Sequence, residues 1–288
     1  MFFPSTQQSG IDKSQGKNKV QLEIFDVGHG ACAMVTHENG ACIMIDCGQS
    51  NDPLWKPGDY LYSKGIEKID ILAITNYDED HVNGLSNLRS RMGIYALWRN
   101  KTVTPSILKY LKSENGMGAG IDELVNMATK YTHPARVLET PGLVRTAFHL
   151  DYPDFKDENN LSMVVHLSLH GIGFLFPGDL ETAGWEALLA KNEHFRYAVK
   201  NTQVLVASHH GRESGKCEDI FSKYGCAPYA VVISDKGYMH DTQQTVPWYR
   251  SKVMPKEIPF RGEMRHVLTT RHDGTIRFNC NSDSWSAG

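Results

Sequence analysis

Apolar positions along the chain follow two periods, and their succession predicts a protein of the α/β class. Short apolar runs are typical of strands, whereas apolar residues three or four positions apart are typical of helices. Strands are expected at Val20–Val27, Ala31–His37, Ala41–Asp46, Ile69–Thr75, Val144–Leu150, Ser162–His170, Gly173–Phe176, Val204–Ser208 and Tyr229–Ser234. Helices are expected at Gly84–Met92, Ser106–Ser113, Ile121–Tyr131 and Glu181–Lys191.

Turn signals and composition predict how these elements are connected and grouped into a domain. Glu38–Gly40 predicts a hairpin between two strands, and His272–Gly274 predicts a closing hairpin between Val267–Thr270 and Thr275–Cys280. Because both halves are rich in strands with helices between them, we expect two sheets packed face to face with helices outside. Residues 1–17, rich in Ser, Gln, Gly and Lys, are predicted to form a flexible leader, and residues 18–288 a single domain.

Charge and cysteine usage narrow the function classes. The net charge of −3 excludes a protein that binds polyanions over its whole surface, so any nucleic-acid contact has to be local. The six cysteines form no CxxC pair, and we expect them to be reduced and buried. No apolar run approaches the roughly 18 residues of a membrane span. These features predict a cytoplasmic protein without a membrane partner.

Side chains that bind metals gather where the predicted strands end. Asp78, Asp80 and His81 lie within four positions after the strand Ile69–Thr75, and such crowding of like charges requires a cation to balance it. The other strand-end residues of this kind are Asp26, Asp46, Asp179, His209, His210 and His240. Taken alone, Asp179 is better explained as a helix N-cap. On a strand, His209 and His210 would point to opposite faces, so at most one of them is expected to be a ligand.

The ordered set of motifs resembles the metallo-β-lactamase fold, in the branch that contains the nuclease-like domain of ComEC competence proteins and the phosphorylcholine esterases. The motifs that carry the resemblance are "DVGHGACAMV", "IMIDCG", "ITNYDEDHVNGL", "NNLSMVVHL", "FLFPGDLE", "VLVASHHG", "AVVISD" followed by "MH", and "VLTTRHDGTIRF". The resemblance implies a four-layer αββα sandwich with a metal centre at one edge. It implies metal ligands at Asp78, Asp80, His81, Asp179, one of His209 and His210, and His240. We take His210 as the ligand and His209 as a catalytic contact to phosphate or to a ligand.

Two departures from the family limit what the resemblance carries over. ComEC proteins have membrane-spanning segments, which this sequence does not show, so DNA uptake through a membrane is not transferred. The family signature has a histidine where this chain has Asn76. If the Asn76 amide is a metal ligand, it is a weaker one than imidazole. We then expect a tight ion held by Asp80, His81, Asp179 and His240, and a weak ion near Asn76, Asp78 and His210. The alternative is that Asn76 only forms hydrogen bonds within its loop.

The donor set indicates the metal and the reaction. Three carboxylates with two or three imidazoles and no thiolate suit Zn²⁺ or Mn²⁺, with Mg²⁺ left open, and argue against redox chemistry. The resemblance implies two ions bridged by Asp179, and we expect Asp80 and His209 to be the catalytic residues. Two ions would lower the pKa of a shared water and hold both oxygens of a phosphodiester in the displacement.

We therefore predict a metal-dependent hydrolase, a nuclease or phosphodiesterase that uses a hydroxide held by the metal, with nucleic acid or a nucleotide as its partner. A local charge bias supports this, because residues 245–280 contain seven basic residues against three acids, with Trp248, Tyr249 and Phe260 interleaved. An ordinary solvated hairpin face explains the same bias. Two other functions remain open, namely a catalytically weakened protein that uses the fold for binding or sensing, and a lactonase or esterase.

Overall fold

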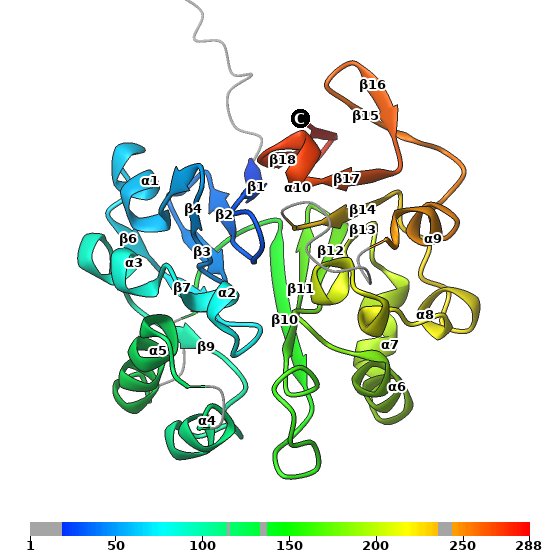
Figure 1. Cartoon of the computed structure of the whole chain (residues 1–288). Helices are drawn as coiled ribbons and strands as arrows, with labels where there is room; N and C mark the ends of the chain where they lie inside the picture. The colour runs from blue at the N-terminus through cyan, green and yellow to red at the C-terminus, as the bar shows by residue number, and fades with distance from the viewer. Residues whose placement is uncertain (1–18, 114–115, 133–136, 236–243) are drawn as a thin grey trace, which may run out of the picture.

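The computed structural model describes residues 19–113, 116–132, 137–235 and 244–288 (Figure 1). Within these residues two large sheets, of nine and six strands, face one another, and helices cover the outer face of each (Figure 1). The N-terminal half of the chain supplies the helices on one side, and the C-terminal half supplies those on the other (Figure 1). The predicted leader, residues 1–17, lies outside the described part of the chain.

The nine-stranded sheet joins the first strands of the chain to the last. In spatial order it contains β16 (Glu263–Arg265), β15 (Ile258–Phe260), β19 (Trp285–Ala287), β18 (Ile276–Cys280), β1 (Val20–Ile24), β2 (Ala33–His37), β3 (Cys42–Ile45), β7 (Ile71–Ala73) and β9 (Leu97–Trp98). Strands β1, β2 and β3 are antiparallel, and the His37 N–H donates to the Ala41 carbonyl at 2.9 Å, which confirms the first predicted hairpin. Strands β7 and β9 then continue parallel to β3.

The six-stranded sheet changes from antiparallel to parallel along its width. Its order is β10 (Leu143–His149), β11 (Met163–Leu169), β12 (Ile172–Phe176), β13 (Val204–Val206), β14 (Ala230–Ile233) and β17 (Val267–Thr269). Strand β11 is antiparallel to both of its neighbours, β10 and β12. From β12 onward the strands run parallel, in the order β12, β13, β14 and β17. Two small sheets complete the strands, β4 (Ser50–Asn51) with β5 (Leu54–Trp55) and β6 (Lys68–Ile69) with β8 (Gly93–Ile94).

The helices form the two outer layers. Those of the first half are α1 (Pro57–Ser63), α2 (Glu79–Val82), α3 (Leu85–Arg91), α4 (Pro105–Leu111) and α5 (Ala119–Lys130). Those of the second half are α6 (Thr182–Lys191), α7 (Glu193–Lys200), α8 (Asp219–Ser222), α9 (Val246–Arg250) and α10 (Thr270–Asp273). The periodicity of the sequence located α3, α4, α5 and α6, but it did not locate α1, α2, α7, α8, α9 or α10. Among the described helices, none is long and apolar enough to cross a bilayer.

Three apolar clusters lie between four layers, which confirms the αββα sandwich. Side chains alternate across a strand, so Ile43 and Ile45 of β3 enter the cluster between the sheets, while Met44 enters the cluster beneath α1, α3, α4 and α5. The second sheet divides in the same way. Phe174 faces the other sheet, and Leu175 packs beneath α6 and α7. The two sheets therefore share one apolar interface, which fixes their edges relative to each other.

The predicted closing hairpin is wrong. Strand β17 pairs with β14 in the six-stranded sheet, whereas β18 pairs with β1 in the nine-stranded sheet. Between them the chain forms α10, and the Asp273 carboxylate accepts the Thr269 N–H at 2.8 Å. The local turn signal was real, but the apolar faces of the two strands are buried against partners far away in the sequence. This segment crosses from one sheet to the other.

One edge of the sandwich has very closely packed backbone. A Cβ atom added at Gly48 would lie 2.5 Å from the Asp80 carbonyl oxygen and 2.8 Å from the Ala31 carbonyl oxygen. A Cβ at Gly30, where φ is +149°, would also lie 2.5 Å from the Asp80 oxygen. Glycine is therefore required at both positions for the chain to reach the segment after β7.

We expect Gly48→Ala to lower the free energy of unfolding by about 1–3 kcal/mol, because its methyl group overlaps backbone atoms that cannot rotate away. Urea denaturation would measure the change. The matched control is Gly93→Ala, where the nearest atom to a new Cβ is 3.9 Å away and little change is expected. Equal stability of Gly48→Ala and the wild type would show that this close packing is not a constraint.

Candidate metal centre

Four potential metal ligands and the carboxylate of Asp46 converge at the edge where β3, β7, β12 and β13 end. Asp46 follows β3, the segment after β7 carries Asp80 and His81 in the short helix α2, Asp179 follows β12, and His210 follows β13. In α/β sheets the carboxyl ends of neighbouring strands are where side chains from different loops meet. These segments follow strands of both sheets. The packing of the two sheets through their apolar interface therefore sets the distances among the ligand side chains.

The most buried group consists of His81, Asp179 and His210, whose ligand atoms all lie within 4.8 Å of one another. The His81 Nε2 lies 3.1 Å from the Asp179 Oδ1, and the His210 Nε2 lies 3.5 Å from the same oxygen. The side chains of His81, Asp179 and His210 are at most 3% exposed. A carboxylate this deeply buried is stable only with cationic or hydrogen-bonding partners.

A second group, His29, Asp80 and His210, adjoins the first and shares His210 with it. The Asp80 Oδ2 lies 3.4 Å from the His29 Nε2 and 3.2 Å from the His210 Nε2. The sequence analysis named Asp80 and His210 but missed His29. Its only signal was its place in the motif "DVGHG", where a histidine stands beside Gly30 on a loop after a strand.

Asp46 orients the imidazole of His81. The Asp46 Oδ2 lies 2.9 Å from the His81 Nδ1, while the Asp46 Oδ1 accepts the Thr75 N–H at 2.7 Å. The backbone of Asp46 has φ of 56°, which a residue other than glycine adopts only when its surroundings enforce it. A hydrogen bond to Nδ1 turns Nε2 toward Asp179, an arrangement found in metal-binding histidines. The sequence marked Asp46 as a strand-end acid without giving it this role.

Electrostatics at the centre favour charged carboxylates. Burial opposes the charge on Asp80, but the hydrogen bond and the charge of His210 outweigh it and lower the pKa of Asp80 to about 2. Burial likewise opposes the charge on His81, yet Asp179 and Asp46 raise the pKa of His81 well above its usual value. Burial and the charge of His210 lower the pKa of His29 to about 4. A divalent ion would take over from the His81 proton in balancing the carboxylates.

The residues present fit one divalent ion. Imidazole and carboxylate donors without thiolate suit Zn²⁺ or Mn²⁺. A cavity of about 30 Å³, lined among others by Asp46, His81, Asp179 and His210, lies between these donors. Its volume is on the scale of one water molecule or one ion.

Asn76 and Asp78 do not join either group. The Asn76 Oδ1 accepts the Asp78 N–H at 2.7 Å, and its Nδ2 donates to the Ser162 Oγ at 3.1 Å. The Asp78 carboxylate forms an ion pair with Lys112, which also donates to the Glu158 Oε1 at 2.8 Å. Asn76 thus forms hydrogen bonds within its loop, which is the alternative to its being a metal ligand. His210, which we expected beside Asn76 and Asp78, lies with Asp80 and Asp179 instead.

His209 and His210 are not on a strand, so the expectation that they point to opposite faces is wrong. Strand β13 ends at Val206, and both histidines have positive φ, 51° and 52°, in the turn Ser208–Gly211. Both side chains are buried in this turn. The His209 Nε2 lies 3.0 Å from the Arg212 Nη1 and 3.9 Å from the Asp179 Oδ2, so His209 joins a guanidinium to the edge of the centre. His240 lies outside the described residues.

The basic stretch from residue 245 to 280 is largely engaged in contacts of its own. Ion pairs with Asp or Glu side chains engage Lys252, Arg265, Arg271 and Arg277. The Arg261 guanidinium donates to the main-chain carbonyl oxygens of Asp273 and Thr275. Tyr249 is buried at 2% exposure and Phe260 at 3%, so neither ring is available to stack on a base. This arrangement favours a structural role for most of the stretch.

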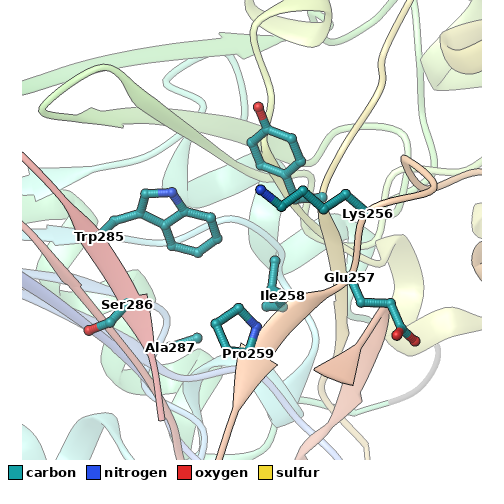
Figure 2. A pocket seen from close by; sticks show the side chains of 8 residues that line it. Lys256, Glu257, Ile258, Pro259, Trp285, Ser286 and Ala287 are labelled. Atoms are coloured by element: carbon teal, nitrogen blue, oxygen red, sulfur yellow. The ribbon is translucent and has the colours of Figure 1, made fainter. Parts of the chain in front are cut away.

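A separate hollow of about 300 Å³ lies between β15 and β19 (Figure 2). Ile258, Pro259 and Trp285 face it, and the side chain of Lys256 extends over it toward Trp285 (Figure 2). Glu257 is the one acid in its lining, and no histidine or cysteine accompanies it among the described residues. The hollow therefore lacks a metal-binding donor set, and the chemistry is assigned to the buried His/Asp centre.

Comparison with known proteins places the chain in a family. The model of the metallo-beta-lactamase superfamily matches residues 25–253. ComE operon protein 3 of Bacillus subtilis (strain 168) is 24% identical over 281 residues, covering 90% of this chain and 33% of that protein. Competence protein ComA of Neisseria gonorrhoeae is 23% identical over 231 residues, covering 79% and 29%. The chain thus spans about a third of the length of these curated relatives.

Among solved structures, the fold is similar to that of a diphosphatase from the PhnP family. The two chains are 14% identical, with a TM-score of 0.43, and the match covers 91% of this chain and 98% of the other.

We expect His29→Ala to weaken the binding of Mn²⁺ or Zn²⁺ by at least about tenfold, because it removes one imidazole from the second donor group. Isothermal titration of the metal-free protein would measure the dissociation constant. The control is His149→Ala, whose ring pairs with Asp151 at 3.0 Å on β10, outside both donor groups. Unchanged affinity in His29→Ala would exclude His29 from the ligand set.

We expect Asp46→Asn to weaken metal binding about 10–100-fold while the protein stays folded. The neutral amide replaces the carboxylate that accepts the His81 Nδ1–H, so it holds the imidazole ring less firmly in the orientation that turns Nε2 toward Asp179. The control is Asp70→Asn, a carboxylate that accepts the Cys42 N–H at 2.9 Å and pairs with Lys68. The same titration, with circular dichroism to confirm folding, decides the matter. A loss of the same size in both variants would indicate a general structural effect.

Proposed function

The chain belongs to the metallo-beta-lactamase superfamily, and on that premise we propose that it is a metal-dependent hydrolase acting on phosphodiesters. The observation that carries the proposal is the convergence of three imidazoles and two carboxylates on one edge of the sandwich, where His81, Asp179 and His210 are buried and His29 and Asp80 are half-buried. Burial of this many ionisable groups costs stability unless they serve a ligand. An ion held there supplies Lewis acidity and a water of lowered pKa.

The charges around the centre favour an anionic substrate. The Arg212 guanidinium lies at one side of the centre, 3.0 Å from His209. His209 contacts the Ser214 Oγ at 3.0 Å and the Glu181 Oε1 at 3.3 Å through Nδ1, which leaves Nε2 directed at Arg212. We assign His209 as the residue that positions this guanidinium, and Arg212 as the contact to a phosphate oxygen. A neutral lactone would gain little from such a group.

The length of the substrate is a separate question. Most basic side chains of residues 245–280 are engaged locally, so the proposal does not rest on a track for long polynucleotides. The names of the two curated relatives refer to competence, which makes DNA one substrate to test.

The six cysteines are all free and buried, which supports a reducing compartment such as the cytoplasm as the place of action.

One observation favours a second candidate, a member of the fold that binds or senses without turnover. Asp78, which the family resemblance assigns to a metal, pairs with Lys112 instead, and Asn76, which stands where the family signature has a histidine, donates to Ser162. A binding protein of this kind would show no hydrolysis even when fully loaded with Mn²⁺ or Zn²⁺. Turnover of any phosphodiester at a rate that depends on the added metal would reject it.

We expect Asp80→Ala and His81→Ala each to lower kcat/KM by at least about a hundredfold, because each removes a donor and leaves the remaining charges without their partner. The assay uses bis(4-nitrophenyl) phosphate and single- and double-stranded DNA and RNA, with Mn²⁺ or Zn²⁺. The control is Asp154→Ala, an acid 69% exposed that pairs only loosely with Lys191 at 3.8 Å.

Full activity in either variant would remove the centre from the mechanism. Hydrolysis of lactones or carboxyl esters, without phosphodiester turnover, would replace the proposed substrate class.

A further inference from the structure

A buried ammonium group pairs with Asp78, which lies two residues before Asp80 of the metal centre. Lys112 follows α4, its side chain is 7% exposed, and its Nζ contacts the carboxylates of Asp78 and Glu158. Burial works against the charge of Lys112, but hydrogen bonds to the two carboxylates outweigh it and raise the pKa of Lys112. The ammonium is thus held between two carboxylates.

The loop that joins this ammonium to the centre is short. Asp78 and Asp80 are two residues apart, and their side chains point to different partners. Asp78 pairs with Lys112, whereas Asp80 faces His29 and His210. Along seven residues of chain, from Asn76 to Val82, one carboxylate is balanced by an ammonium and the next by imidazoles.

Within the part of the chain that the structure describes, the donors that a second ion would need on the Lys112 side are already engaged. Asn76 is fully buried, with its oxygen on the Asp78 N–H and its nitrogen on the Ser162 Oγ. The Ser162 Oγ in turn accepts the Asp179 N–H at 3.2 Å. Among the described residues, neither group of potential metal ligands includes Asn76, Asp78 or Glu158. A dication placed at Asp78 would meet the Lys112 ammonium, and like charges at contact repel.

We propose that the centre binds a single divalent ion in the set formed by His29, Asp80, His81, Asp179 and His210, and that the Lys112 ammonium takes the place of a second ion between Asp78 and Glu158. The inference rests on the proposed function only in requiring that the centre binds metal. Lys112 is a positioning residue, because it holds the loop that carries Asp80 and His81.

The test is the number of ions bound. Metal-free protein is titrated with Mn²⁺ and with Zn²⁺, and metal content after dialysis is measured by mass spectrometry. We expect one equivalent in the wild type, and an electron paramagnetic resonance spectrum of an isolated Mn²⁺ ion. Two equivalents, or a spectrum of two coupled ions, would overturn the inference while leaving the proposed function intact.

Variants test the role of the ammonium itself. Asn76→His with Lys112→Met frees the Asp78 carboxylate and adds an imidazole beside it, so the stoichiometry should rise from one to two. Lys112→Arg keeps the charge and should still bind one ion. The control is Lys109→Met, an exposed lysine on the same helix, which should also bind one ion. A double variant that remains at one equivalent, with wild-type circular dichroism, would overturn the role given to Lys112.

The two proposals fail separately. Wild-type protein that binds one ion without hydrolysing any phosphodiester would refute the proposed function and support the single-ion centre. Wild-type protein that binds no ion would overturn both. If the double variant does not fold, the wild-type stoichiometry and the Lys112→Arg variant still decide, because two ions in either one contradict the inference.

Discussion

The chain of buried side chains from Asp46 through His81 to Asp179 is the interaction on which the rest of the centre depends. Its two contacts measure 2.9 Å and 3.1 Å, and the three side chains are at most 3% exposed. Asp46 follows a strand of the nine-stranded sheet, and Asp179 follows a strand of the six-stranded sheet. One imidazole therefore ties the two sheets together at the edge. Buried charges of this kind are retained only if each is balanced, which makes their geometry specific.

Close packing of the main chain also holds Asp80 and His81 in position. Gly30 and Gly48 approach the Asp80 carbonyl so closely that no side chain fits at either position. The Ala31 N–H donates to the same carbonyl at 3.1 Å, and the Cys47 N–H donates to the His81 carbonyl at 2.8 Å. The loop after β7 is thus held by its main chain as well as by its side chains. Asp80 and His81 have little freedom to move, which is the preorganisation that a metal site needs.

The parts of this structure that sequence could predict are those with a local or ordered signal. The alternation in β3 and the apolar spacing of α5 gave the elements and their buried faces. The ordered motifs and the resemblance they carry named Asp80, His81, Asp179 and His210 as ligands, but they placed His210 with Asn76 and Asp78 rather than with the other three. The closing hairpin failed because the partners of β17 and β18 are distant strands. His29 and Lys112 were missed because their partners lie far along the chain, at Asp80 for the one and at Asp78 and Glu158 for the other. No local pattern reports such a pairing.

The departure at Asn76 becomes intelligible from the way the loop after β7 divides its side chains. Thr75 and His81 turn toward Asp46, Asp80 turns toward His29 and His210, and Asp78 turns toward Lys112. The donors on the Asp80 side do not depend on residue 76 for their position, because Asp46 and the packed glycines hold them. An amide at position 76 can then serve the loop, through Asp78 and Ser162, without disturbing them. An ammonium carries a smaller charge than a divalent ion, so Lys112 balances only part of the charge of the two carboxylates that the chain brings together from residues 78 and 158. The Asp78 side chain is 39% exposed, so water solvates the remaining charge, and this pairing does not require the ligand set of the family signature.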